Sequence, residues 1–373
     1  MAILSTFGAM TARGFGWLLQ AISVPSGALY SWGDAAQGQL GSGNTTNRSS
    51  PVQVGALTTW SKVTAGVNLL VAIKTDGTLW AHGFNGDGQL GLGDITNRSS
   101  PVQVGALTTW AAISAREHTL AIKTDGTLWA WGLNDFGQLG LGNTVNRSSP
   151  VQVGALTTWS EIGAGGQLTL AIKTDGTLWA WGYNAYGQLG TSNTTNRSSP
   201  VQVGALTTWS KVAANRVHTL AIKTDGTLWA WGLNYQGQLG LGDITNRSSP
   251  VQVGVLTAWS KVASDRHSLA IKTDGTLWAW GTNDQGQLGL GDITDRSSPV
   301  QVGALTTWSE IGAGEAHTLA IKTDGTLWAW GWNPLGQLGT SNTTNRSSPV
   351  QVGALTTWIS AKASGYFSVA IKT

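Results

Sequence analysis

The sequence predicts an all-β protein, a seven-bladed β-propeller, and three observations lead to that prediction. The tetrapeptide Gly-Gln-Leu-Gly occurs seven times, at intervals of 49 or 50 residues. Each interval holds four short runs with the composition of β-strands and no stretch of ten or more residues with helical periodicity. The two ends of the chain hold complementary parts of one repeat. A fixed period of this size is typical of repeat architectures, and four short strands per repeat make one propeller blade.

Two markers define the repeat. The Gly-Gln-Leu-Gly copies begin at Gly38, Gly88, Gly137, Gly187, Gly237, Gly286 and Gly336. The octapeptide Arg-Ser-Ser-Pro-Val-Gln-Val-Gly begins in the same rhythm at Arg48, Arg98, Arg147, Arg197, Arg247, Arg296 and Arg346. We therefore assign residues 25–373 to the propeller and residues 1–24 to an N-terminal arm.

One copy shows how the four strands arise. An extended run begins at Trp110 and is followed by a β-rich run, residues 118–124. Asp125-Gly126 supplies the positive φ of a tight turn, so residues 127–132 return as the second arm of a hairpin. The last run starts at Pro150, which lacks a backbone N–H and therefore suits an edge strand.

The chain ends predict how the ring closes. The sequence stops at Thr373, where five of the other copies continue with Asp-Gly-Thr-Leu-Trp-Ala-Trp-Gly and the sixth differs only at His82, and residues 27–33 supply the matching piece. A closing blade shared between the N- and C-termini removes free sheet edges. An open superhelix is the alternative, and it would leave both ends uncapped.

The tryptophans follow the same repeat. Nineteen of the 21 occupy three slots of the unit, with Tyr30 and His82 as the substitutes, and only Trp17 and Trp332 lie elsewhere. Tryptophan at a spacing of two residues lies on one face of a strand, where it can bury a large apolar area. We expect these rings to pack one blade against the next.

Composition excludes several classes of function. The net charge of +3 is spread over the repeats, so we expect no nucleic-acid partner. The absence of cysteine removes disulfides and thiolate sites, and no apolar run approaches the roughly 18 residues that would predict membrane insertion. Four of the five histidines share one repeat slot, which indicates a structural role. No asymmetric catalytic set stands apart from the repeat, so we predict no enzyme, no cofactor and no metal site.

In these motifs the sequence resembles the regulator of chromosome condensation repeat family, whose fold is a seven-bladed propeller. Family members serve as exchange factors, receptors and interaction modules, so the resemblance implies a fold more than a function. The exchange factor relies on a basic tail and a blade insertion, and this chain has neither. The plant ultraviolet-B receptor uses a Gly-Trp-Arg-His-Thr element, whereas residues 115–119 here read Ala-Arg-Glu-His-Thr and lack the tryptophan. The uniform copies and residues 7–16 are also similar to repeat arrays of phage tail and virion structural proteins.

The copies differ from one another mainly in two slots. One lies between Trp-Gly and Gly-Gln-Leu-Gly, and the other precedes the Ala-Ile-Lys-Thr strand, where two copies are one residue shorter. Aromatic, amide and arginine side chains in these slots are typical of recognition surfaces. Neutral drift in solvated loops is the alternative. The candidate binding residues are Phe84, Asn85, Arg116, Phe136, Tyr183, Tyr186, Arg216, Tyr235, Arg266, Trp332, Tyr366 and Phe367.

Residues 10–24 align loosely with a half-blade that the ring does not need. We expect the arm, residues 1–24, to anchor the protein on other structural proteins or on sister chains; displacement of residues 358–373 from the closing blade is the alternative. The residues expected to make the apolar anchoring contacts are Phe7, Phe15, Trp17, Leu18 and Leu19.

These features favour a non-enzymatic binding protein on a virion or an extracellular surface. Its variable loops would recognise a host glycan, a protein receptor or another structural protein. The alternative is an intracellular, cytoplasmic scaffold or a partner of a small GTPase, and a purely architectural role is a third hypothesis.

Overall fold

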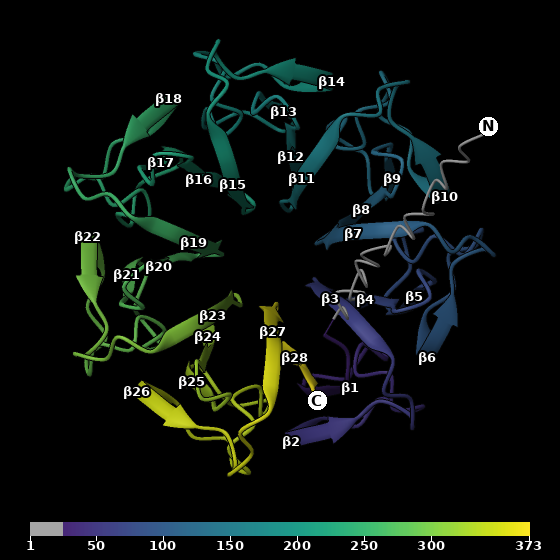
Figure 1. Ribbon diagram of the computed structural model, residues 1–373, viewed down its shortest axis with the longest axis vertical. Helices are drawn as coiled ribbons and strands as arrows, with labels where there is room; N and C mark the ends of the chain where they lie inside the picture. Colours follow the sequence, from purple (N-terminus) through teal and green to yellow (C-terminus); the bar gives the residue numbers. More distant parts are fainter. Residues whose placement is uncertain (1–24) are drawn as a thin grey trace, which may run out of the picture.

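The structure, a computed structural model, describes residues 25–373 (Figure 1). They form seven four-stranded antiparallel sheets arranged as blades around a central axis. The predicted arm, residues 1–24, and its expected anchoring residues lie outside the described residues. Between residues 25 and 373 there is no helix long and apolar enough to cross a membrane.

Six blades are continuous in the chain, and each is given below from its inner to its outer strand. Blade 1 consists of β3 (Trp60–Gly66), β4 (Leu69–Lys74), β5 (Leu79–Gly83) and β6 (Arg98–Gln103). Blade 2 consists of β7 (Trp110–Ala115), β8 (His118–Lys123), β9 (Leu128–Gly132) and β10 (Arg147–Gln152). Blade 3 consists of β11 (Trp159–Ala164), β12 (Leu168–Lys173), β13 (Leu178–Gly182) and β14 (Arg197–Gln202).

The remaining blades repeat this pattern. Blade 4 consists of β15 (Trp209–Ala214), β16 (His218–Lys223), β17 (Leu228–Gly232) and β18 (Arg247–Gln252). Blade 5 consists of β19 (Trp259–Ser264), β20 (His267–Lys272), β21 (Leu277–Gly281) and β22 (Arg296–Gln301). Blade 6 consists of β23 (Trp308–Ala313), β24 (His317–Lys322), β25 (Leu327–Gly331) and β26 (Arg346–Gln351). Blade 7 consists of β27 (Trp358–Ser364), β28 (Phe367–Lys372), β1 (Ala28–Gly33) and β2 (Arg48–Gln53).

Blade 7 confirms the predicted closure. Its strand order is β2-β1-β28-β27, and β1 pairs with β28 from Ala28 opposite Lys372 to Gly33 opposite Phe367. Figure 1 shows the first strands of the chain beside its last. The open superhelix is therefore wrong, because the two ends of the chain complete one sheet.

The core lies between the blades. Leu120 and Ala130 of blade 2 share one apolar cluster with Trp159 and Trp181 of blade 3. The Trp181 ring is fully buried, and its Nε1 donates to the carbonyl of Gln138 at 2.9 Å. This confirms that the tryptophans of the repeat pack one blade against the next.

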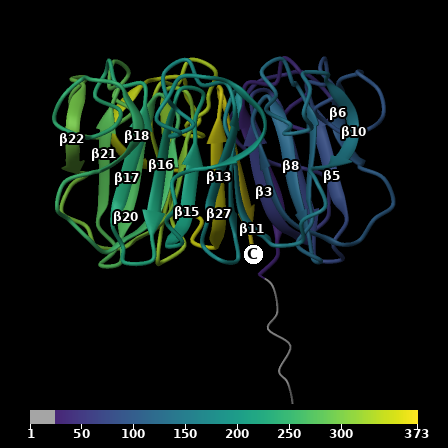
Figure 2. The ribbon, with the colours of Figure 1, turned by 90° about the horizontal axis from the view of Figure 1, so that it is seen from above.

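Strand direction sorts the loops onto two faces. Because neighbouring strands of a blade are antiparallel, the turn between the two inner strands and the loop before the outer strand open at the same end. These segments form the variable-loop face: residues 67–68, 116–117, 165–167, 215–217, 265–266, 314–316 and 365–366, with 34–47, 84–97, 133–146, 183–196, 233–246, 282–295 and 332–345. The opposite hairpin face carries the Lys-Thr-Asp-Gly turns and the C-terminus (Figure 2). Both slots in which the copies differ therefore lie on one face.

Candidate functional site

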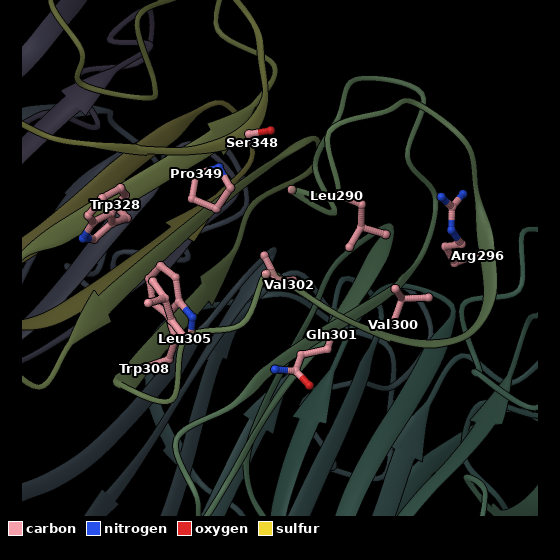
Figure 3. A pocket seen from close by; sticks show the side chains of 12 residues that line it. Leu290, Arg296, Val300, Gln301, Val302, Leu305, Trp308, Trp328, Ser348 and Pro349 are labelled. Atoms are coloured by element: carbon pink, nitrogen blue, oxygen red, sulfur yellow. The ribbon is translucent and has the colours of Figure 1, made fainter.

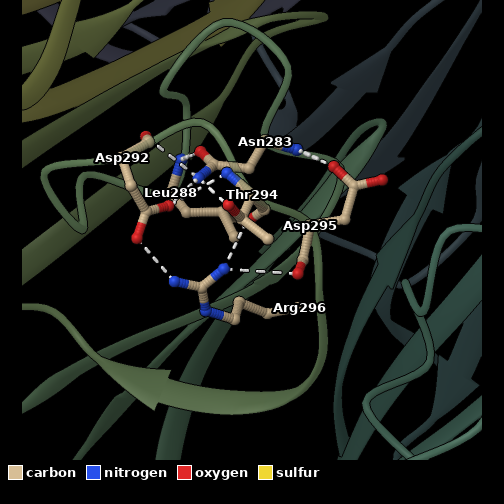
Figure 4. Close-up of polar contacts among 6 residues, drawn as sticks. All are labelled: Asn283, Leu288, Asp292, Thr294, Asp295 and Arg296. Atoms are coloured by element: carbon tan, nitrogen blue, oxygen red, sulfur yellow. Dashed lines mark hydrogen bonds and ion pairs between the residues drawn. The ribbon is translucent and has the colours of Figure 1, made fainter.

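Six of the seven longer loops of the variable-loop face are held by one buried asparagine each, and the loop of blade 7 has Ala35 in that position. In blade 5, Asn283 Oδ1 accepts from the backbone N–H of Leu288 at 2.9 Å, and its Nδ2 donates to the Asp292 carbonyl at 3.1 Å (Figure 4). Asn85 has the equivalent bonds in blade 1 and is fully buried. The prediction that Asn85 lies on a binding surface is therefore wrong, because its amide is used to shape the loop.

A pocket of about 620 Å³ opens at the axis of this face. The inner turns of six blades contribute to its wall, together with three tyrosines of the longer loops. Its polar and charged lining residues are Arg116, Glu117, Gln167, Asn215, Arg216, Gln236, Gln238, Asp265, Arg266 and Glu315. The three predicted arginines are thus brought together in one pocket, although they come from three different repeats.

An ion pair spans the axis at the floor of this pocket. Arg116 of blade 2 donates to both carboxylate oxygens of Asp265 in blade 5, at 2.7 and 3.1 Å. The two side chains are 12% and 1% exposed. Arg116 also lines a second cavity of about 140 Å³, which lies between the inner strands. The pair therefore lies between the open pocket and this second cavity.

Burial alone would lower the pKa of Arg116, but the charge and hydrogen bonds of Asp265 outweigh it and raise that pKa. A one-residue deletion in two copies of the repeat is a sequence feature that distinguishes the turns holding this pair. Two of the seven inner turns are one residue shorter than the other five. Arg116 lies in one of them and Asp265 in the other.

Glu117 lies beside this pair in a partly desolvated position. Burial raises its pKa, and the nearby carboxylates Asp87 and Asp135 act in the same direction. The guanidinium groups of Arg116 and Arg216 oppose this shift. Charges of both signs thus face the pocket, which suits a partner that also carries both.

Aromatic side chains continue from the pocket across the longer loops of blades 2, 3 and 4. Tyr183 lies 4.7 Å from Phe136 and 6.2 Å from Tyr186, measured between ring centroids. Tyr186 and Tyr235 are 38% and 57% exposed and line the pocket. Exposed tyrosines of this kind offer rigid contact area with a polar end.

The other predicted aromatic residues divide into surface and core. Trp332 and Tyr366 pack together at 4.8 Å and are half-buried, and Phe84 is half-buried on its own loop. Phe367 is fully buried in β28, inside an apolar cluster. The prediction that Phe367 belongs to a binding loop is therefore wrong, because it is the first residue of the strand and occupies the slot that holds histidine in four blades.

Those four histidines connect neighbouring blades. His118 Nε2 lies 2.7 Å from Thr169 Oγ1, and that hydroxyl donates to the Gln138 carbonyl at 2.7 Å. Since the threonine proton is already used, Nε2 of His118 must be the donor. The equivalent residues are His218, His267 and His317. Their role is structural, as the repeat slot indicated. Within residues 25–373 no three histidine, aspartate or glutamate side chains form a group that could hold a metal ion.

Three family models match the chain. The RCC1-like domain matches residues 11–264, and the regulator of chromosome condensation (RCC1) repeat matches residues 274–321 and 324–371. A second RCC1 repeat model matches residues 308–337. No curated protein sequence matches the chain.

Several solved structures share the fold. Human WBSCR16 is 21% identical over 94% of this chain and 99% of its own, with a TM-score of 0.84. Prp20p from Saccharomyces cerevisiae, described with its binding to Gsp1p and histones, is 20% identical over 94% of this chain and 93% of its own, with a TM-score of 0.84. The structure of Kap60 bound to yeast RCC1 (Prp20) is similar at 20% identity over 93% of this chain and 90% of that one, also with a TM-score of 0.84.

Proposed function

The chain belongs to the regulator of chromosome condensation (RCC1) repeat family, and from that premise we propose that it is a non-enzymatic propeller that binds a partner protein on its variable-loop face. The observation that carries the proposal is the convergence of both variable slots on one pocket. That pocket combines exposed tyrosines with arginine and carboxylate side chains. Tyrosine and arginine, together with tryptophan, are enriched among the residues that dominate the binding energy of protein interfaces.

We propose that the protein acts inside the cell rather than on a virion or an extracellular surface. Human WBSCR16, Prp20p and yeast RCC1 are not described as virion components, so the virion setting, the host receptor and the structural-protein partners find no support among these three structures. Prp20p is described by its binding to Gsp1p and histones, and yeast RCC1 by its complex with Kap60. A scaffold or regulator that binds another protein, with a small GTPase as one candidate partner, fits this pattern better.

A matched pair of variants tests the proposal. The pocket variant combines Tyr186→Ala, Arg216→Ala and Tyr235→Ala. The control variant places serine at three leucines of the hairpin face that are 46–48% exposed, namely Leu57, Leu107 and Leu156. Each purified chain, immobilised at equal density, captures proteins from an extract of the native cells, and each candidate is then purified and titrated by calorimetry.

We expect at least one protein to bind the unmodified chain and the control variant directly. Its affinity for the pocket variant should fall by about tenfold or more, because exposed tyrosine and arginine anchors typically each contribute over 1 kcal/mol. If every protein that binds the unmodified chain also binds the pocket variant equally well, the variable-loop face is not the binding site. Thermal unfolding of all three chains shows whether the substitutions leave the fold intact.

A further inference from the structure

The outer wall of the propeller carries grooves of one kind between neighbouring blades. Three of them have volumes of about 570, 400 and 460 Å³, behind the outer strands of blades 5, 6 and 3. Figure 3 shows the blade 5 groove, in which Val300, Val302 and Leu305 face Trp328 and Pro349 of the next blade. Each groove has an apolar wall and an arginine on its outer strand, namely Arg296, Arg346 and Arg197.

The grooves differ in what neutralises that arginine. In blade 5, the guanidinium of Arg296 forms an ion pair with Asp292 at 2.6 Å (Figure 4). In blade 3, the acidic residue is replaced by Asn193, whose Oδ1 accepts from Thr195 N and whose Nδ2 donates to the Thr191 carbonyl. The amide is thus used within its own loop and does not reach Arg197.

The same replacement occurs in blade 6. Asn342 Nδ2 donates to the Thr340 carbonyl at 3.0 Å, and its Oδ1 accepts from Thr344 N at 3.0 Å. Among the described residues, neither Arg197 nor Arg346 has an acidic side chain within 4 Å. The Nε atom of each is buried without a hydrogen-bond partner. These two grooves therefore combine an apolar wall with an uncompensated positive charge.

From this arrangement we propose that the grooves of blades 3 and 6 bind an acidic peptide segment of a partner protein. A carboxylate of the segment pairs with Arg197 or Arg346. An apolar side chain next to that carboxylate packs against Leu206 and Trp229 in blade 3. Paired charge-assisted hydrogen bonds are the geometry in which a guanidinium binds a carboxylate most strongly.

The backbone of the groove favours a peptide over other acidic ligands. Strand β14 is the last strand of its sheet, so its outer edge has no partner strand. The N–H of Val203 donates inward to the Leu178 carbonyl at 2.8 Å. Because backbone groups alternate between the two edges of a strand, those of Gln202 point outward, and Pro200 falls on the outward side where no donor is lost. An extended peptide can pair with this edge while its side chains enter the groove.

Other blades of the chain supply the matched variants. Asn193→Asp with Asn342→Asp introduces the acidic residue that blades 1, 4 and 5 already have, so the fold should be retained. Asp292→Asn makes the reverse change in blade 5. The probe is the acetylated, amidated hexapeptide Leu-Glu-Val-Glu-Leu-Glu, and its counterpart with three glutamines is the neutral control. Binding is followed through the arginine Nε–H signals of the ¹⁵N-labelled chain.

We expect the glutamate peptide to shift the Arg197 and Arg346 signals and to leave Arg296 unchanged. The double aspartate variant should weaken that binding at least tenfold, and Asp292→Asn should make the Arg296 signal respond. Equal binding of the glutamine peptide, or shifts confined to Arg216 and Arg266 on the variable-loop face, would overturn the proposal. The result does not depend on the partner proposed for the variable-loop face, because the two sites use different residues and different probes.

Discussion

His82 shows what one residue changes in an otherwise uniform repeat. Six blades have tryptophan in its slot, and in blade 2 the Trp131 Nε1 donates to the Gln89 carbonyl at 3.0 Å. His82 is buried without a hydrogen bond of proper geometry at either nitrogen, although the Gln39 carbonyl lies close enough to favour its protonated form slightly. Burial lowers the pKa of His82 to about 3. The substitution therefore places a buried imidazole without a hydrogen-bond partner where the other blades have an indole whose N–H is hydrogen-bonded.

All five histidines together predict a loss of stability in acid. Burial lowers the pKa to about 3 in His82, His118, His218 and His317, and to about 4 in His267. Because the unfolded chain binds protons at its ordinary histidine pKa of about 6.5 and the folded chain does not, the free energy of unfolding should fall as pH drops below 6.5. The slope reaches at most about 1.4 kcal/mol per histidine per pH unit, and it levels off near the folded pKa values.

Urea unfolding at pH 7, 6, 5 and 4 measures this slope. His82→Trp is the matched variant, because tryptophan fills the equivalent slot of the other blades. It should be more stable than the unmodified chain, and its slope should be smaller by the contribution of one histidine. A stability that stays constant between pH 7 and 4 would contradict the buried, neutral state of these rings.

At the scale of elements, the Arg116–Asp265 ion pair joins the two shorter inner turns across the ring, and we call this connection the brace. Arg116 and Asp265 lie three blades apart, and their side chains meet over the axis. Removing one member of a buried ion pair leaves the other charge unpaired, which costs about 3–5 kcal/mol. Removing both costs much less.

We therefore expect Arg116→Met to lower the free energy of unfolding by about 3 kcal/mol or more. The double variant Arg116→Met with Asp265→Leu should recover most of that loss. The control is Arg266→Met on the neighbouring exposed arginine, which should change stability by less than about 0.5 kcal/mol. Equal effects of the two single substitutions in equilibrium urea unfolding would show that the brace does not stabilise the ring.

At this scale, the sequence predicts which loops vary but not which of their side chains are buried. Comparison of the copies predicts the variable slots, but it extends one of them by one residue, to Phe367, because the first residue of a strand cannot be distinguished from a loop residue without the register of β28 against β1. The sequence predicts Asn85 on the binding surface, because an amide that binds its own loop cannot be distinguished in sequence from one that faces solvent.

At the scale of the whole molecule, ring closure rests on the junction between the two chain ends. The N–H of Gly27 donates to the Trp60 carbonyl at 3.0 Å, and the N–H of Trp60 donates back to the Gly27 carbonyl at 3.2 Å. The equivalent bond from Trp110 to Gly77 in blade 1 has the same length. A β-carbon on Gly27 would lie 2.0 Å from the Lys372 carbonyl oxygen, so the two ends abut.

A circular permutant tests this closure. One aspartate placed between Thr373 and Gly27 restores the Lys-Thr-Asp-Gly turn of the other blades, and new ends can be opened in the exposed segment between Gly55 and Thr59. We expect this chain to fold and to melt within a few degrees of the unmodified protein, as measured by circular dichroism. A chain that lacks residues 367–373 should lose cooperative unfolding, because it lacks β28, the strand that joins β1 to the inner strand β27. If truncation and permutation have equal effects, the shared blade does not hold the ring closed.

The repeat, the number of blades, the order of the strands and the shared closing blade could be predicted from the sequence, whereas the outer strand of blade 2 begins at Arg147 and not at the predicted Pro150. These follow from local patterns: turn residues, alternating apolar residues, and a period that recurs seven times. Three further facts require the folded ring: Arg116 meets Asp265, Tyr183 and Arg216 line one pocket, and Arg197 and Arg346 lack an ion pair while Arg296 has one. These facts depend on distances across the ring and between blades, and such distances are set by the packing of whole blades, which no local pattern records.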